Sequence, residues 1–257
     1  MTDLSSTVIH IGPALGVALV LLTVVAAVVN RLSGSGEGAA TVWSVARAVV
    51  QLGILAALIA LVMHRLWASA LFMVVMGVVA GTTSARRIAR HDRRDVRRRV
   101  RETACCVVAV AVPALVIVAV LIPAGVLPPN GLAVIPTAGI MFGGAMNTAS
   151  LAGRRALDEL RLRAGEVEAA LSLGFSPRDA RSEICRPAAA SALMPALDQT
   201  KSVGLVTIPG SFVGMILGGA SPLVAGIMQL FVLIGILAVS SIAMALTVEF
   251  VARGELA

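Results

Sequence analysis

Residues 86–101 read RRIARHDRRDVRRRVR, and residues 103–122, one position further on, read TACCVVAVAVPALVIVAVLI. The first run carries nine arginines, whereas the second has no charged side chain. An apolar run of about 20 residues is long enough to cross the hydrocarbon core of a bilayer as an α-helix. Arginine and lysine beside such a run stay preferentially in the cytosol. The two runs together therefore predict a membrane-spanning helix that begins at a strongly basic cytosolic segment.

The composition of the whole chain agrees with a membrane protein. Of the 257 residues, 58% are hydrophobic and 14% are charged, and the mean hydropathy is +0.94. Soluble domains are about one-quarter charged, so a soluble protein is excluded. A backbone in lipid must satisfy its own hydrogen bonds, and the short alternating segments of a barrel are missing from the sequence. The expected fold class is an all-α polytopic membrane protein.

Seven apolar runs along the chain are each long enough to span a membrane. The first follows the acidic Asp3 with no positive residue before it, so we interpret it as a span and not as a cleaved signal peptide. The predicted spans are Val8–Val29, Val42–Met63, Trp67–Ala85, Thr103–Ile122, Gly131–Gly153, Ser191–Leu217 and Leu223–Val248.

The basic residues predict the orientation of these spans. Arg154–Arg186 carries seven further arginines and lies two spans after the basic segment 86–101. Of the 21 lysines and arginines, 18 fall on this side of the membrane and Arg65 falls on the other, while Arg47 and Lys201 lie inside spans. The positive-inside rule then puts the N-terminus outside and the C-terminus in the cytosol. The net charge of +7 reports this asymmetry, so nucleic acid is not an expected partner.

Two features leave alternatives open. The basic segment 86–101 is either a helix that faces solvent and lipid headgroups or a contact for a cytosolic partner. Small-residue spacings allow helices to approach closely, either within one chain or between two subunits. These spacings are Gly12 to Gly16, Gly77 to Gly81, Gly139 to Gly143, and Gly210 to Gly214 to Gly218.

Signatures of catalysis are missing from the sequence. The histidines His10, His64 and His91 lie at or beyond the ends of spans, which leaves no intramembrane protease dyad. The single lysine, Lys201, follows Thr200, so the chain has no phosphate-binding loop of the type Gly-x-x-x-x-Gly-Lys. Adjacent cysteines on one helix point about 100° apart, so Cys105 and Cys106 are expected to pack and not to bind metal. We therefore expect neither an enzyme nor a resident metal site.

The cytosolic segment 154–190 contains a predicted helix, turn and helix. Residues up to Leu173 favour a helix, Gly174 suits the left-handed conformation that ends one, and Ser176 before Pro177 suits the start of the next. One face of the first helix is apolar and suits docking into a groove on a partner. That face consists of Val167, Ala170, Leu171 and Gly174.

The spacing in this segment resembles the Glu-Ala-Ala loop of ABC-transporter permeases. Glu168-Ala169-Ala170 is followed after three residues by Gly174, and nine residues later comes Ile184, two residues before Pro187. The family pattern has Leu at the position of Arg186. In that family the loop fits a cleft of a separate ATP-hydrolysing subunit. The residues that the resemblance assigns to ATPase coupling are Glu168, Ala169, Ala170, Leu171, Gly174, Ile184 and Pro187.

Further motifs resemble the Fet-type iron-export permeases, to which plant aluminium-tolerance permeases are related. They are IPTAG at 135–139, GAMN at 144–147, DQTKSVGLVTIPG at 198–210, GGASP at 218–222 and Gln229. The resemblance covers about residues 41–250. It implies one permease domain over 1–257, a homodimer with two ATPase subunits that bind ATP and Mg, and no cofactor in this chain. It also implies a multi-pass protein of the inner (plasma) membrane that exports a metal ion such as iron.

The predicted sixth span is the expected transport pathway. Pro209-Gly210 should kink or interrupt its helix, and freed backbone groups at such a break face protein or a water-filled cavity. Asp198 and Lys201, one turn apart, are either an intrahelical ion pair or gating charges. The oxygens available to a hard metal ion in the spans are few, chiefly those of Asp198 and Glu249. The candidate pathway residues are Asn147, Asp198, Gln199, Lys201, Pro209, Gly210 and Gln229.

Other functions remain open from the residues. An ion-gradient-driven transporter would work without a partner, but it needs a titratable relay in the spans. An ABC permease for a non-metal cargo such as a nucleotide sugar would share the coupling loop. A membrane scaffold without cargo is the third alternative.

Overall fold

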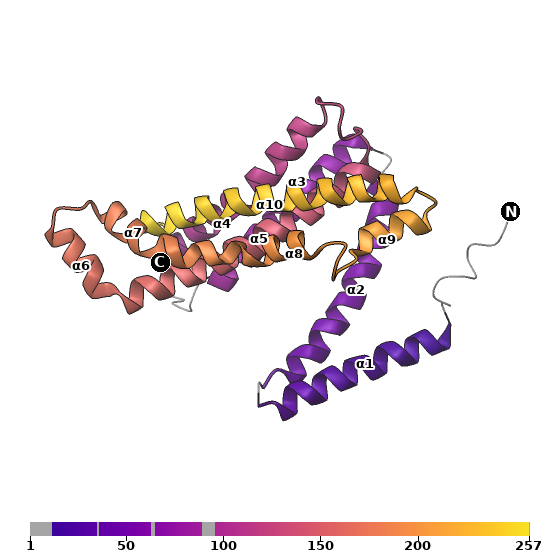
Figure 1. Ribbon diagram of the computed structural model, residues 1–257, viewed down its shortest axis with the longest axis horizontal. Helices are drawn as coiled ribbons and strands as arrows, with labels where there is room; N and C mark the ends of the chain where they lie inside the picture. The colour runs from indigo at the N-terminus through magenta and orange to yellow at the C-terminus, as the bar shows by residue number, and fades with distance from the viewer. Residues whose placement is uncertain (1–11, 35, 63–64, 89–95, 257) are drawn as a thin grey trace. The chain divides into compact units, whose positions relative to one another are not determined.

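The computed structural model describes residues 12–34, 36–62, 65–88 and 96–256, and its regular elements in these ranges are helices (Figure 1). It divides into two compact units, Met1–Leu61 and Val62–Ala257. The elements are α1 Pro13–Leu32, α2 Gly38–Val62, α3 Leu66–Ile88, α4 Val96–Leu121, α5 Gly131–Leu162, α6 Ala164–Ser172, α7 Pro177–Ala190, the 3-10 turn η2 Ser191–Leu193, α8 Met194–Ser202, α9 Gly210–Leu217 and α10 Pro222–Ala252.

The first unit is a pair of helices. Pro13 begins α1, where its missing N–H costs no intrahelical bond. Near the connection between the helices, Asn30 Nδ2 donates to Thr41 Oγ1 over 2.9 Å. No residue of α1 is buried within the described part of the chain, although the helix is almost wholly apolar. Such a surface suits lipid or protein and not water.

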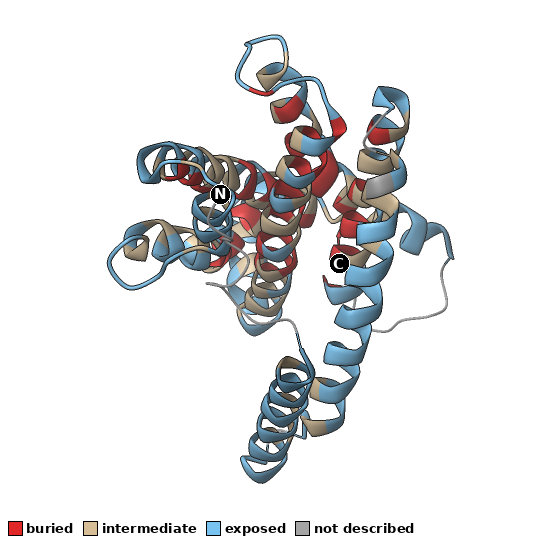
Figure 2. Cartoon of the chain, turned by 90° about the vertical axis from the view of Figure 1, so that its right-hand side faces the viewer, coloured by how far each residue is buried: buried red, intermediate tan, exposed pale blue. Residues whose placement is uncertain are grey.

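The second unit is a helical bundle with α5 at its centre. Helix α5 packs against α10, α3, α7 and α4, and α10 extends along the unit from α9 to α7 (Figure 1). Figure 2 shows that the buried residues gather in the interior of the bundle. Many of the buried side chains are small, which lets the helix backbones approach closely. The buried centre includes Val110, Ala138, Phe142, Ala145 and Val239.

Close packing inside the bundle explains one of the glycine spacings. A Cβ at Gly81 of α3 would lie 2.4 Å from the Cα of Val107 on α4, and one at Gly77 would lie 2.9 Å from the Cβ of Ala111. Only glycine fits at Gly81, so this pair serves packing within the chain. At Gly210 and Gly214, by contrast, a Cβ would meet nothing within 4 Å among the described residues.

Six of the described helices are long and apolar enough to cross a membrane: α1, α2, α3, α4, α5 and α10. The predicted class, an all-α polytopic membrane protein, is confirmed. Predicted boundaries differ at the cytosolic ends, because α5 continues beyond Gly153 to Leu162 and α4 begins at Val96, within the basic segment. The start of the first predicted span at Val8, the end of the second at Met63, the histidines 10, 64 and 91, and arginines 90, 93 and 94 lie outside the described residues.

The predicted sixth span, Ser191–Leu217, is not one continuous helix, so it is the one predicted span without a single long helix among the described residues. It consists of η2, α8, a non-helical stretch at 203–209, and α9. Val203 is extended, Gly204 has φ +79°, and its N–H donates to the Thr207 carbonyl over 2.9 Å. Pro209 then precedes α9 without an N–H to donate. The interruption predicted at Pro209-Gly210 is therefore present, and it extends back to Val203.

Candidate functional site

The segment 154–190, which is predicted to be cytosolic and to couple to an ATPase, turns at a corner between α5 and α6. Arg163, at this corner, donates from Nε to Glu166 Oε1 over 2.6 Å and from NH1 to Glu159 Oε1 over 3.5 Å. The hydrogen bond from Arg163 lowers the pKa of the Glu166 carboxyl below its ordinary value, and the same bond raises the pKa of Arg163. One guanidinium thus ties the first turn of α6 to the last turn of α5.

The turn between α6 and α7 has the predicted form. Gly174 has φ +89°, its N–H donates to the Leu171 carbonyl over 3.0 Å, and the Phe175 N–H donates to the Ala170 carbonyl over 3.1 Å. These two bonds are the paired bonds of a Schellman motif. Ser176 Oγ then accepts from the Asp179 N–H over 3.1 Å, and Pro177 opens α7. The predicted helix, turn and helix are confirmed as structure, while their coupling role stays a prediction.

The apolar residues of this segment are open to solvent. No residue of α6 is buried within the described structure, and Glu168 and Ala169 are exposed. The exposed fractions are 41% for Leu171, 80% for Leu173 and 50% for Phe175. We call these three residues, on α6 and its following turn, the apolar edge.

The remaining predicted coupling residues lie on α7 and divide between its two faces. Ile184 is buried beside Cys185, so its side chain packs inside the protein, and its coupling role stays a prediction. Pro187 is exposed. Arg186 is exposed as well, so the charge that replaces the Leu of the family pattern removes no core contact.

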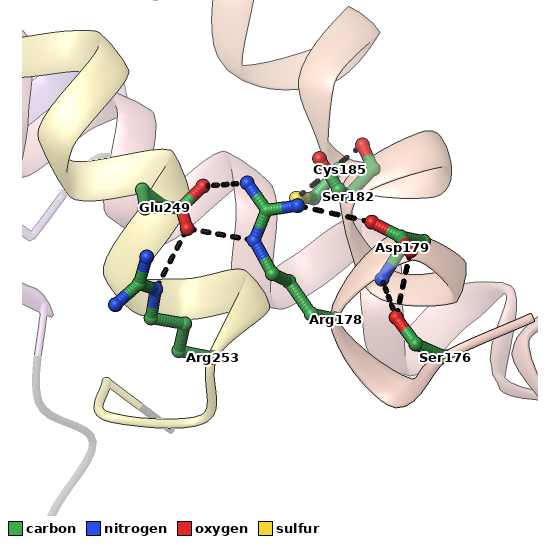
Figure 3. Close-up of polar contacts among 7 residues, drawn as sticks. All are labelled: Ser176, Arg178, Asp179, Ser182, Cys185, Glu249 and Arg253. Carbon is green, nitrogen blue, oxygen red and sulfur yellow. Dashed lines mark hydrogen bonds and ion pairs between the residues drawn. The ribbon is translucent and has the colours of Figure 1, made fainter.

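Helix α7 is joined to the end of α10 by an ion pair that sequence reasoning missed (Figure 3). Arg178 donates from Nε and NH2 to the two carboxylate oxygens of Glu249, each over 2.7 Å. Arg253 donates to Glu249 over 2.7 Å, and Asp179 lies 3.0 Å from Arg178 NH1. The bonds from Glu249 raise the pKa of Arg178. Since 71 positions separate Arg178 from Glu249, no local signal in the sequence indicates the pair.

The predicted pathway residues lie on four helices, α5, α8, α9 and α10, and in the non-helical stretch before α9. Asn147 on α5 accepts a hydrogen bond from Arg87 NH1 over 3.0 Å, and Gln229 on α10 is buried and accepts from Ser211 Oγ on α9. Asp198, Gln199 and Lys201 are exposed on α8, just before the interruption that ends at Pro209 and Gly210. No hydrogen bond or ion pair among the described residues joins Asp198, Asn147 and Gln229 to one another.

Of the two interpretations left open for Asp198 and Lys201, the ion pair is not formed between these described residues, and a role as gating charges stays a prediction. Glu249, the other carboxylate considered for a metal ion, is bound by Arg178 and Arg253. In the described part of the chain, no three His, Cys, Asp or Glu side chains gather as metal ligands. Cys106 and Cys185 are buried in one apolar cluster, as expected for packing residues, and burial raises the pKa of the Cys185 thiol.

The fold defines a multi-pass helical membrane protein. The chain belongs to the family described as "Uncharacterised protein family (UPF0014)", whose model matches residues 14–255.

Three relatives illustrate the family. "UPF0014 membrane protein STAR2" of Oryza sativa subsp. japonica is 32% identical over 90% of this chain and 79% of its own length. "Protein ALUMINUM SENSITIVE 3" of Arabidopsis thaliana is 32% identical over 90% of this chain and 82% of its own length. "Probable iron export permease protein FetB" of Escherichia coli (strain K12) is 34% identical over 52% of each chain. No solved structure matches this chain. The resemblance drawn from the motifs is therefore confirmed.

Proposed function

We propose that this chain is the membrane subunit of an ATP-driven exporter of a metal ion such as iron, with ATP and Mg bound by a separate cytosolic ATPase. The observation that carries the proposal is the apolar edge at Leu171, Leu173 and Phe175. These side chains are 41–80% exposed on a turn that lies outside every apolar span. Apolar side chains gathered on a water-facing surface typically mark a protein-binding site.

The local geometry supports docking of a partner at this turn. The Schellman bonds and the Ser176 cap hold the turn in one conformation, so a partner meets a preformed surface. The partner is expected to supply ATP hydrolysis, because the chain has no phosphate-binding loop of its own.

The cargo and the assembly are supported by separate observations. The Escherichia coli relative is called a probable iron export permease, and that name supports a metal ion as the cargo here. Asp198, exposed on α8, is one oxygen ligand, and a two-fold dimer would supply a second copy. The open faces of Gly210 and Gly214 support contact with a second permease in the plasma membrane.

Purification of the tagged permease from the membranes of its own cells tests the proposal. We expect an ATPase subunit, identified by photolabelling with 8-azido-ATP, to copurify. Liposomes that contain this complex in the inside-out orientation should take up Fe²⁺ only when ATP is added. Absence of the ATPase, or uptake that survives ATP removal and collapses with an uncoupler, would show that the proposal is wrong.

Two glycines of the segment provide a matched pair of variants. Gly174→Val forces a β-branched residue into the left-handed region and should abolish copurification of the ATPase. Gly165 lies on α6, and a Cβ at this position would meet nothing within 4 Å among the described residues. Gly165→Val should therefore leave copurification of the ATPase intact.

A further inference from the structure

The coupling segment is connected to the membrane helices at both of its ends, to α5 at its start and through α7 further on. Helix α6 packs mainly against α7, with a smaller contact to α5. A displacement of α6 by a partner is therefore passed to α7 through this packing, and to α5 through the corner at Arg163. From α7 the chain itself continues through η2 into α8, which gives one route to the interrupted segment.

A second route leaves α7 at its first turn, next to the coupling turn. Arg178 binds both carboxylate oxygens of Glu249 near the end of α10 (Figure 3). A two-bond guanidinium–carboxylate contact fixes direction as well as distance. The side chains are 44% and 24% exposed, and ion pairs so open to solvent contribute little to stability. The contact therefore constrains geometry more than it stabilises the fold.

Neighbouring contacts make the end of α10 a junction. Arg253, one turn beyond Glu249, donates to the same carboxylate over 2.7 Å. Glu255 lies 2.9 Å from Arg101 Nε, which adds the start of α4 to the junction. Leu256 is 2% exposed and packs in the same apolar cluster as Cys106 and Cys185. A movement of α7 that reaches Glu249 therefore acts on an end of α10 that these contacts hold in place.

Helix α10 leads from this junction to the other side of the interruption. Gln229 lies 20 positions before Glu249, about 30 Å along a straight helix. There Gln229 accepts a hydrogen bond from Ser211 on α9. Helices α8 and α9 flank the non-helical stretch at 203–209, and each is thereby connected to α7, one through the chain and the other through α10.

We infer that the Arg178–Glu249 ion pair is a transmission contact, through which ATPase-driven movement of α7 reaches α10 and, through α10, the half of the interrupted segment at α9. This inference rests on the proposed function. Arg178 and Glu249 are positioning residues that touch no cargo. Without their contact, α7 keeps only its apolar packing against α5 and α10, which does not fix the direction of the movement, and ATP hydrolysis continues with little transport.

Reconstituted complexes of permease and ATPase provide the test, with ATP hydrolysis and Fe²⁺ uptake measured in the same liposomes. Arg178→Ala should keep the ATPase bound and active but reduce the Fe²⁺ moved per ATP by about tenfold. The charge-swapped double variant Arg178→Glu with Glu249→Arg should recover at least half of the loss, a rescue that general destabilisation would not give. Arg161→Ala removes a comparably exposed arginine whose Asp158 partner is 3.8 Å away, and it should have no effect.

The outcomes separate the inference from the proposed function. If the unaltered permease binds no ATPase, the proposed function fails and the inference with it. If the unaltered complex transports and Arg178→Ala transports equally well, only the transmission contact is wrong. If Arg178→Ala loses the ATPase altogether, the charge swap decides: recovered transport supports the contact, and continued loss overturns it.

Discussion

Ser211 on α9 donates a hydrogen bond to the buried amide oxygen of Gln229 on α10, 18 positions further along the chain. Gln229 is 6% exposed, so its amide has little access to other partners. This contact holds the second half of the interrupted segment against α10, the helix that packs most extensively on α5. It also explains how a glutamine is accommodated in a strongly apolar helix.

Removal of the hydrogen-bond donor alone should lower the free energy of unfolding more than removal of both the donor and the acceptor. Ser211→Ala leaves the Gln229 oxygen buried and unpaired, so we expect a loss of about 1–3 kcal/mol in the free energy of unfolding. Ser211→Ala combined with Gln229→Leu removes the unpaired group as well and should recover much of that loss. Thermal unfolding in detergent measures both variants. Equal stability of Ser211→Ala and the unaltered protein would contradict the hydrogen bond.

The close contact of α3 with α4 should not tolerate a methyl group. Gly81→Ala places a Cβ against the backbone of Val107, and we expect a loss of about 1–3 kcal/mol or a shift of the two helices. Gly143→Ala is the control, because a Cβ there meets nothing within 4 Å among the described residues. Unfolding midpoints of the two variants in the same detergent make the comparison. A control less stable than Gly81→Ala would refute the packing explanation.

The hydrogen bond from Arg163 to Glu166 should determine the pH at which Glu166 titrates. Because Arg163 lowers the pKa of Glu166 from 4.5, the pair contributes stability above that ordinary value and loses it as the pH falls through the lowered pKa. Arg163→Ala should raise the pKa of Glu166 back toward 4.5, as measured by carbon-13 NMR of the carboxyl group. Arg161→Ala, which removes the arginine paired with Asp158, should leave the Glu166 titration unchanged. The same titration curve for Glu166 in the unaltered protein, Arg163→Ala and Arg161→Ala would contradict the contact between Arg163 and Glu166.

Polar substitutions in the apolar edge should weaken the ATPase contact without unfolding the permease. Leu173→Ser and Phe175→Ser change exposed side chains, so we expect the unfolding midpoint to stay the same and the Kd for the ATPase to rise about tenfold. Val126→Ser is the control, since Val126 is 56% exposed in a connection that the orientation predicts to be outside the cell. Binding is measured by titration of the purified subunits. An unchanged Kd for both edge variants would exclude the edge as a docking surface.

Local features of the coupling segment were predictable because their causes lie within a few residues. The conformation of Gly174 and the cap at Ser176 follow from residue type and the two or three positions that follow. The interruption before Gly210 was indicated by Pro209 for the same reason. Its extension back to Val203 was not, because Gly204 adopts φ +79° in a stretch whose apolar composition also suits a helix.

The pathway and coupling residues show that a sequence pattern does not predict which side chains become buried or paired. The family resemblance assigned Ile184 to the coupling segment without stating its burial, which depends on how α7 packs against α5 and α10. The possible pairing of Asp198 with Lys201, one of two alternatives, rested only on their separation on one helix, and the structure leaves both side chains exposed and unpaired with each other. Helical spacing states which residues share a face, but it does not state what that face meets.

The amino-acid sequence by itself determined that this protein is helical and crosses a membrane several times, and it predicts that the basic residues lie mainly on one side. Hydrophobicity, charge and backbone preference act residue by residue, so those properties need no knowledge of distant contacts. Only the tertiary structure decided that Arg178 meets Glu249, that Gly81 packs on Val107, and that Ser211 meets Gln229. Each of these contacts depends on the packing of helices that are separate in the chain, which local preferences do not specify.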